Sequence, residues 1–115
     1  MTPRLPVTLE DTALRSLRSC RHSLIDHQQW APAEAHAYTQ RLVAGALQRL
    51  SEQPGIYPTC RLALELGISQ YHELLIEGYR VIYRYWPEQG QVSIYLFCHQ
   101  RQDFKQLLFE YQLLS

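Results

Sequence analysis

The chain has 115 residues, of which 46% are hydrophobic and 19% charged, and its 11 basic and 11 acidic residues leave no formal net charge at pH 7. This length and composition predict one globular domain over residues 1–115 that folds without disulfides or metals. A neutral chain has no overall field that draws it to nucleic acid, so any phosphate contact needs a local patch of arginines. Hydropathy predicts neither a membrane span nor a signal peptide, and we expect a cytoplasmic protein without a membrane partner.

The amino-terminal half is predicted to form a helical hairpin. Two prolines limit residues 1–8 to an extended arm or a brief edge strand. Thr8 to Asp11 resembles a capping box, and apolar residues then recur every three to four positions, which predicts a helix over 9–27. A second apolar stripe, with a proline in its first turn, predicts a helix over 32–52. Two such helices joined by a short connection pack antiparallel, and their apolar seam needs a cover.

The carboxy-terminal half is predicted to form a three-stranded antiparallel meander within residues 71–103. Three runs rich in Tyr, Val, Ile, Leu and Phe are separated by Glu77-Gly78 and by residues 86–91, and both separators are typical of hairpin turns. Residues 54–70 are predicted to be mostly loop. A terminal helix is predicted over 102–114, with Asp103 as its cap.

The two turns predict a register for the meander. A tight first turn pairs Ile76 with Tyr79, and the second hairpin pairs Tyr85 with Val92. Regular alternation then puts Val81 opposite Leu96 and Tyr79 opposite Cys98. One face of this sheet is nearly all apolar and is expected to pack on the helices. The opposite face is expected to collect Tyr71, Glu73, Leu75, Arg80, Ile82, Arg84, Ser93, Tyr95, Phe97 and His99.

This second face carries the most informative set of polar side chains, and it has two interpretations. In the structural one, Arg80 and Arg84 are solvated or paired with neighbouring glutamates. In the functional one the arginines hold phosphates, because the planar guanidinium binds phosphate bidentately. His99, Tyr95 or Glu73 would then move a proton, and histidine titrates near neutral pH. Cleavage of RNA by its own 2′-hydroxyl needs such an acid, a base and positive charge.

Other motifs that carry chemistry are not evident. The cysteines Cys20, Cys60 and Cys98 are far apart and odd in number, so we interpret them as small buried hydrophobic residues in a reducing compartment. The spacing of His22 and His27 is not that of two metal ligands on one helical face. A glycine-rich phosphate loop and a nucleophile elbow are also missing from the sequence. We therefore expect no metal and no cofactor.

Two sequence motifs resemble a known family. The run EGYRVIYR at residues 77–84, and the strand ending HQRQD at 99–103, are similar to the carboxy-terminal half of the RelE/ParE superfamily of bacterial toxins. The preceding helical hairpin fits as well, so the resemblance covers nearly the whole chain. We expect an α+β fold in which an amino-terminal helical hairpin packs on a small, twisted, mainly antiparallel sheet, with a short carboxy-terminal helix.

The resemblance implies the toxin of a type II toxin–antitoxin pair, a two-component stability module in which the toxin inhibits growth and a cognate antitoxin wraps and silences it. Two activities occur in the superfamily. ParE-like members poison DNA gyrase without an accepted nuclease site, whereas RelE-like members are ribosome-dependent endoribonucleases that cut mRNA. The neutral charge, with Lys105 as the only lysine, and the long helical hairpin favour the ParE-like activity.

Three functions therefore remain open: gyrase inhibition, mRNA cleavage, and an inactive toxin fold that only binds its antitoxin. Only mRNA cleavage would make the chain an enzyme. In that case we expect His99, Arg84 and Arg80 to be catalytic. The arginines would bind phosphate and His99 would transfer the proton, with Arg101, Tyr95 and Glu73 as further binding residues.

Overall fold

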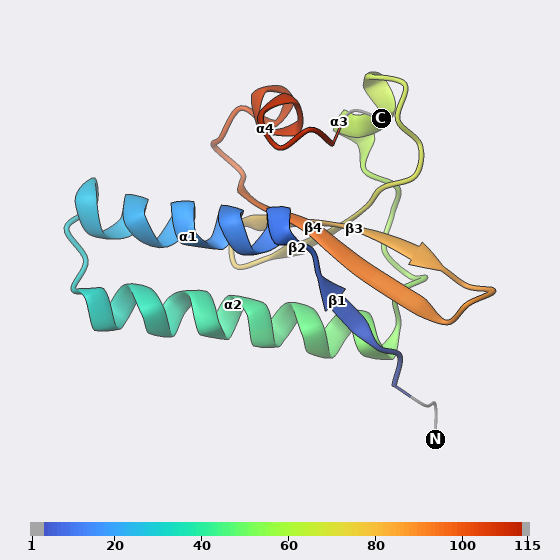
Figure 1. The fold of residues 1–115 in the computed structure, drawn as a ribbon, viewed down its shortest axis with the longest axis horizontal. Coiled ribbons are helices and arrows are strands. Elements are labelled where there is room, and N and C mark those ends of the chain that lie inside the picture. Colours follow the sequence, from blue (N-terminus) through green and yellow to red (C-terminus); the bar gives the residue numbers. More distant parts are fainter. Residues whose placement is uncertain (1–3, 114–115) are drawn as a thin grey trace.

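The computed structural model describes residues 4–113 and shows the expected α+β class. Its elements are β1 (Val7–Leu9), α1 (Asp11–Asp26), α2 (Pro32–Glu52), α3 (Arg61–Glu65), β2 (His72–Ile76), β3 (Tyr79–Trp86), β4 (Gln91–His99) and α4 (Phe104–Glu110). The strands form one sheet in the order β1-β4-β3-β2, in which β1 runs parallel to β4 and the other neighbours are antiparallel (Figure 1). Within this part of the chain, none of the helices is sufficiently long and apolar to cross a membrane.

The helical hairpin of α1 and α2 covers one face of the sheet (Figure 1). The apolar stripes of both helices are buried there against Val81, Tyr83 and Ile94. The second helix has the predicted bounds. The first begins later than predicted, because the preceding residues form β1 and pair with β4. The predicted capping box is wrong: Thr8 lies in β1, and the N-cap residue Glu10 makes no side-chain hydrogen bond.

The β2–β3 hairpin has the predicted register. Ile76 pairs with Tyr79, as the tight turn at Glu77-Gly78 requires. Glu77 has a φ of 49° and Gly78 a φ of 82°. Two successive left-handed residues make the type of turn that matches the twist of an antiparallel hairpin, and glycine adopts this conformation without a steric penalty.

The β3–β4 hairpin departs from the predicted register at a β-bulge. Near the turn, Tyr85 pairs with Val92 as expected. The register then shifts between Tyr83 and Ile82, so that Val81 lies opposite Phe97 and Tyr79 opposite His99. The predicted pairs Val81–Leu96 and Tyr79–Cys98 are therefore wrong. The cause is one extra residue in β4, Tyr95, because a bulge sets two residues against one and reverses the alternation beyond it.

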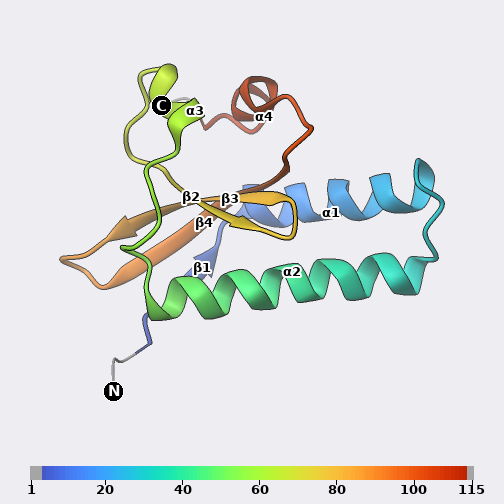
Figure 2. The same cartoon turned by 180° about the vertical axis from the view of Figure 1, so that it is seen from behind.

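The other face of the sheet carries a second core, which the sequence analysis did not predict. Helices α3 and α4 lie over this face, on the side away from α2 (Figure 2). The buried members are Cys60, Ala63, Ile68, Tyr71, Ile82, Leu96, Cys98, Phe104, Leu108, Tyr111 and Leu113.

Both elements over this face differ from their predictions. Helix α3 lies in the segment that was predicted to be mostly loop. Helix α4 is shorter than the predicted 102–114, whose last residue lies outside the described part of the chain. The expected cap of α4 is confirmed, since an Asp103 carboxylate oxygen accepts a hydrogen bond from the Gln106 backbone N–H at 3.1 Å.

Candidate functional site

The bulge in β4 divides the predicted site residues between the two faces of the sheet. Arg80, Arg84, Tyr95 and Glu73 lie on the face covered by α3 and α4. His99 lies on the other face, opposite Tyr79 and next to α1. The expectation that His99 and Phe97 share a face with the arginines is therefore wrong. The three residues predicted to be catalytic do not converge on one point, and their catalytic role stays a prediction.

Arg80 is engaged in an ion pair with Glu73. Its Nη1 donates to Oε1 of Glu73 at 2.8 Å, and the two side chains are 26% and 12% exposed. Such a partly buried pair is tightly held, because either charge alone would lose its hydration without a partner. The guanidinium of Arg80 thus already has a carboxylate partner, as the structural interpretation of this residue required.

Arg84 and Tyr95 form a second polar group on the same face. The Arg84 guanidinium lies over the Trp86 ring, 4.6 Å from its centroid, at a distance typical of a cation–π contact. The Tyr95 ring packs edge-to-face on Tyr71, with centroids 5.5 Å apart. Burial and the charge of Glu10 raise the pKa of Tyr95, while neighbouring Arg84 lowers it in part. Among residues 4–113, Arg84 makes no ion pair.

His99 is held by a tight turn that joins β4 to α4. Its Nδ1 accepts a hydrogen bond from the Arg101 backbone N–H at 3.1 Å, and its own backbone N–H donates to Oε1 of Gln102 at 2.8 Å. The backbone of Gln102 in turn donates to the carbonyl of His99 at 3.0 Å. Because Nδ1 accepts, the hydrogen of the neutral ring lies on Nε2. The ring packs edge-to-face on Tyr79, with centroids 5.1 Å apart.

A cleft of about 440 Å³ opens between α1 and this turn. It is lined by Ser19, Cys20, Ser23, Leu24, Gln28, Tyr79, His99, Arg101 and Gln102. Sequence analysis did not find this cleft, because it used only the apolar stripe of the first helix. A signal was present in Ser19 and Ser23, which are one helical turn apart and adjoin the buried positions Cys20 and Leu24.

The wall of this cleft includes a hydrogen bond between Cys20 and Tyr79. The sulfur and the hydroxyl oxygen are 2.7 Å apart. Burial raises the pKa of both groups, and for Cys20 the hydrogen bond and Arg21 oppose this rise. Burial also raises the pKa of Cys98, on the opposite face, to about 11. All three cysteines are buried and unbridged, which confirms their interpretation as small buried residues. Protonated thiols are poor nucleophiles.

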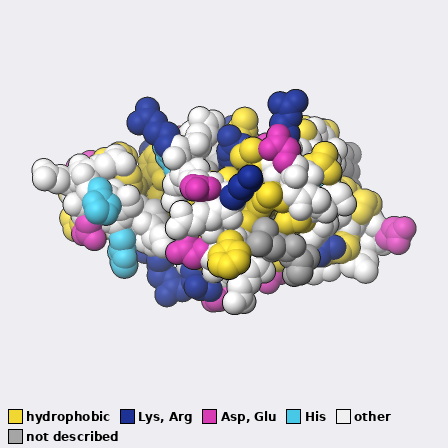
Figure 3. Space-filling view, turned by 90° about the horizontal axis from the view of Figure 1, so that it is seen from above, with side chains coloured by type: hydrophobic (Ala, Val, Ile, Leu, Met, Phe, Trp, Pro, Cys, Tyr) yellow, Lys and Arg dark blue, Asp and Glu magenta, His cyan; other side chains and the backbone are white. Residues whose placement is uncertain are grey.

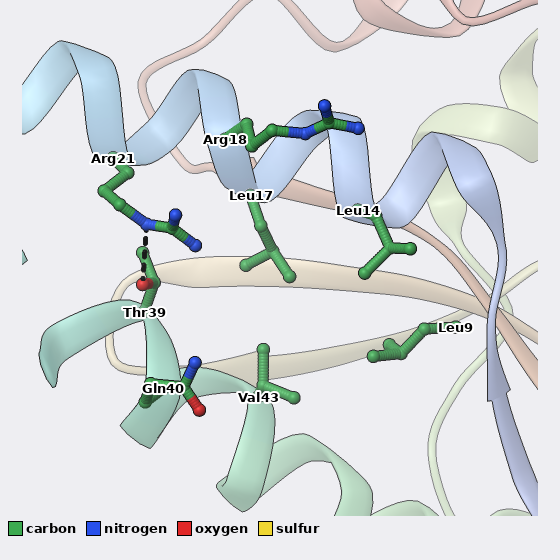
Figure 4. Close-up of a pocket in the computed structure, with 8 residues that line it drawn as sticks. All are labelled: Leu9, Leu14, Leu17, Arg18, Arg21, Thr39, Gln40 and Val43. Carbon is green, nitrogen blue, oxygen red and sulfur yellow. Dashed lines mark hydrogen bonds between the residues drawn. The ribbon is translucent and has the colours of Figure 1, made fainter. Parts of the chain in front are cut away.

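A separate groove of about 420 Å³ lies between α1 and α2. Figure 4 shows apolar side chains that point into it from both helices and from β1, namely Leu9, Leu14, Leu17 and Val43. Arg18 and Arg21 also line it, and Nε of Arg21 donates to the Thr39 hydroxyl at 3.3 Å. Leu14 is 43% exposed. The groove therefore combines an apolar lining with two cations.

Hydrophobic side chains also gather on the face that α3 and α4 form, where they are interspersed with charged groups (Figure 3). Leu64 and Phe109 are exposed there, at 53% and 74%. Scattered exposed apolar residues are normal on a protein surface.

Comparison with known proteins identifies the class of this fold. A chain from the crystal structure of the toxin–antitoxin complex RelBE2 (Rv2865-2866) of Mycobacterium tuberculosis has a similar structure, with a TM-score of 0.57 and 23% sequence identity. The match covers 89% of this chain and 97% of the other. The helical hairpin on a mixed four-stranded sheet is thus a RelE-like fold.

The sequence itself gives the family. The family model for the ParE toxin of type II toxin–antitoxin systems, parDE, matches residues 7–104. No curated protein matches the chain. The chain belongs to the ParE toxin family, and it is a toxin of the type II toxin–antitoxin class.

Proposed function

We propose that this toxin is neutralised by a cognate antitoxin and, when free, inhibits DNA gyrase. The observation that carries the choice of target is the position of His99, which lies on the opposite face of the sheet from Arg80 and Arg84. In-line cleavage of RNA requires the proton-transfer group and the phosphate-binding cations to meet at one phosphate. A sheet lies between them here, so His99 and these arginines cannot serve the same phosphate.

The charge of the chain supports the same target. Ribosomal RNA attracts strongly basic proteins, whereas this chain has equal numbers of acidic and basic residues. Arg80 is further occupied by Glu73. The chain also matches ParE toxins over residues 7–104. The resemblance to that family implies gyrase as the target, which supports the proposal.

For the antitoxin we propose the groove between α1 and α2 as a contact surface. Its apolar lining suits the apolar face of a partner segment, and Arg18 and Arg21 suit carboxylates on that segment. The expected occupant is an antitoxin segment that carries aliphatic anchors and acidic residues. The RelBE2 structure, which is a toxin–antitoxin complex, supports the presence of such a partner.

A second candidate function, mRNA cleavage, rests on Arg84 and Tyr95. These residues stay together on the α3–α4 face, and Arg84 makes no ion pair among residues 4–113. A nuclease built from them would use the arginine to hold phosphate and the tyrosine as its polar partner, without His99. This function differs from the first in its target and in the residues that it needs.

The deciding experiment combines inducible expression with a purified assay. Incorporation of radiolabel into DNA and protein is followed over the first minutes, and supercoiling by purified gyrase is measured with added toxin. An early fall in DNA synthesis and inhibited supercoiling are expected. An immediate stop of protein synthesis, with normal supercoiling, would overturn the gyrase proposal. In that case, cleavage of cellular mRNA that is lost with Arg84→Ala but persists with His99→Ala would support the second candidate. Absence of any growth effect would instead mean an inactive toxin fold.

The antitoxin contact is tested separately with a matched pair of exposed leucines. Leu14→Glu puts a carboxylate into the groove, and we expect the affinity for the small protein encoded beside the toxin gene to fall by at least about tenfold. Leu64→Glu makes the same change on α3, with similar exposure, and should leave the affinity unchanged. Equal effects of the two variants would refute the groove as the contact surface.

A further inference from the structure

The cleft between α1 and the turn after β4 has the chemistry of an anion site. Its lining includes the cation Arg101, the imidazole of His99, two serine hydroxyls and two glutamine amides. None of the lining residues is an acid, although the chain contains as many acidic as basic residues. A cleft rich in hydrogen-bond donors and free of carboxylates favours an anionic ligand.

Arg101 is available for such a ligand. Its side chain is exposed, and it makes no ion pair among the described residues. Two other arginines, by contrast, are engaged in ion pairs: Arg80 with Glu73 and Arg41 with Glu77. The Asp103 carboxylate, two positions from Arg101, caps the backbone of α4. An exposed guanidinium beside a cleft can bind a phosphate with two parallel hydrogen bonds.

The polar groups of the turn are already held in place. Backbone and side-chain hydrogen bonds connect His99, Arg101 and Gln102, and a further bond joins the Gln100 N–H to the carbonyl of Gly78 at 3.1 Å. Because Nδ1 of His99 accepts the Arg101 N–H, Nε2 carries the hydrogen and is a donor for a ligand. Groups that are fixed before binding lose little entropy when the ligand arrives.

The size of the cleft indicates more than a bare ion. Its volume of about 440 Å³ falls within the range of roughly 300–1,000 Å³ for sites of small organic ligands. Tyr79 and Leu24 add apolar surface beside the polar groups. A smaller hollow of about 220 Å³ shares the lining residues Ser19 and Gln102 with the cleft. Glu110 also lines this hollow and would repel an anion there. The anionic end of a ligand therefore belongs next to Arg101.

We infer that this cleft binds a phosphate monoester, with Arg101, His99 and the hydroxyls of Ser19 and Ser23 around the phosphate. The phosphate belongs either to a free nucleotide or to the end of a nucleic-acid strand, and the chemistry at the cleft is the same for both. The site is distinct from the arginines of the α3–α4 face, and it does not depend on which target the toxin has.

The test is a titration of the isotope-labelled full-length toxin, produced by cell-free synthesis and followed by NMR. The probes are inorganic phosphate, adenosine 5′-monophosphate, adenosine, and a short ribo-oligonucleotide with and without a 5′-phosphate. We expect the phosphorylated probes to shift the backbone amides of His99 to Gln102. Adenosine and the oligonucleotide that lacks the phosphate should leave these amides in place.

Matched variants locate the site. Arg101→Gln is expected to raise the dissociation constant of adenosine 5′-monophosphate by at least about tenfold, the effect of losing a charge-assisted hydrogen-bonded pair. Ser23→Asp, which puts a carboxylate into the cleft at an exposed helical position, should abolish binding. Arg49→Gln, an exposed arginine in the last turn of α2, and Arg80→Gln on the other face should each change the constant by less than about twofold.

The outcomes separate clearly. Tighter binding of the phosphorylated oligonucleotide than of the nucleotide would identify a nucleic-acid end as the source of the phosphate, and equal binding would identify a free nucleotide. No binding of any phosphorylated probe below about 10 mM would overturn the inference. Equal loss of affinity for adenosine 5′-monophosphate in Arg101→Gln and Arg49→Gln would also overturn the inference, because it would reveal non-specific electrostatic attraction. A larger effect of Arg80→Gln than of Arg101→Gln would place the phosphate on the opposite face.

Discussion

Tyr79 and His99 face each other across β3 and β4, with their ring centroids 5.1 Å apart in an edge-to-face contact. The contact lies on the side of the sheet that α1 covers, because the Tyr79 hydroxyl also shares a hydrogen bond with Cys20 of that helix. It depends on the bulge, because Tyr95 takes no regular pairing position in β4, whereas regular pairing of the same chain would put Cys98 opposite Tyr79. The bulge thus decides on which face of the sheet the histidine of this chain lies.

Deletion of Tyr95 should therefore preserve the fold and the contact between Tyr79 and His99. Ile94 and Leu96 would then be neighbours in the strand, with side chains on opposite faces of the sheet and with their present partners in β3. We expect a loss of about 1–2 kcal/mol in the free energy of unfolding, from the ring contact with Tyr71 and the hydrogen bond that the Thr12 hydroxyl donates to the Tyr95 carbonyl. Urea unfolding and the NOE between the Tyr79 and His99 rings measure both quantities.

The matched control is deletion of Phe97, a buried residue beyond the bulge. This change removes the Phe97 ring from the first core, even if the bulge is lost and Leu96 takes its place, so we expect a larger loss in the free energy of unfolding than for deletion of Tyr95. If deletion of Tyr95 were as damaging as deletion of Phe97, the bulge assignment would be wrong.

Arg80 and Glu73 form the most buried ion pair of the described residues. Arg80→Met leaves the carboxylate of Glu73, whose side chain is 12% exposed, without its partner. We expect the free energy of unfolding to fall by about 2 kcal/mol, and the double variant Arg80→Met/Glu73→Leu to recover most of it. Chemical denaturation of these two variants and of the single variant Glu73→Leu completes the double-mutant cycle. A change of less than about 0.5 kcal/mol in Arg80→Met would show that the pair behaves like an exposed one.

Tyr83 connects the sheet to the end of the helical hairpin. Its side chain is fully buried, and its hydroxyl donates to the carbonyl of Pro54 at 2.6 Å. Tyr83→Phe leaves that carbonyl without this partner, and we expect a loss of about 1–2 kcal/mol in urea unfolding. Tyr85→Phe is the control, because that ring is only half-buried and its hydroxyl makes no hydrogen bond comparable to that of Tyr83 within residues 4–113. Equal losses in the two variants would contradict the assigned role of the hydroxyl.

Stability should decrease at alkaline pH through the buried thiols and phenols. Burial raises the pKa of Cys98 from 9.0 to about 11, and burial also raises the pKa of Tyr79 and Tyr83. The native state holds these protons more tightly than the unfolded chain. The contribution of Cys98 is therefore complete below about pH 9 and is lost as the pH rises to about 11. The urea midpoint, measured between neutral pH and pH 11, should fall over this window.

Cys98→Ala isolates the thiol from the phenols. The variant should show a flatter dependence of the midpoint on pH between about 9 and 11, because it lacks the group that deprotonates on unfolding. Parallel curves for the variant and the parent chain would show that Cys98 does not contribute.

The sequence by itself determined the elements whose signals are local. The apolar periodicity of α1 and α2 is set by helical geometry, and α2 has its predicted bounds. The tight turn at Glu77-Gly78 leaves one sterically favoured geometry, so it determined the pairing of β2 with β3. The motifs at residues 77–84 and 99–103 were also sufficient to indicate the toxin family, which the family match confirmed.

Only the tertiary structure decided the features that depend on distant partners. A bulge at Tyr95 has no sequence signal of its own, because its position is set by how β4 packs on both cores at once. Pairing of β1 with β4 joins segments far apart in the chain, and α3 is too short to form without the second core beneath it. For these reasons the sequence predicted which residues are chemically interesting, whereas packing decided that His99 lies with Arg101 and apart from Arg80 and Arg84.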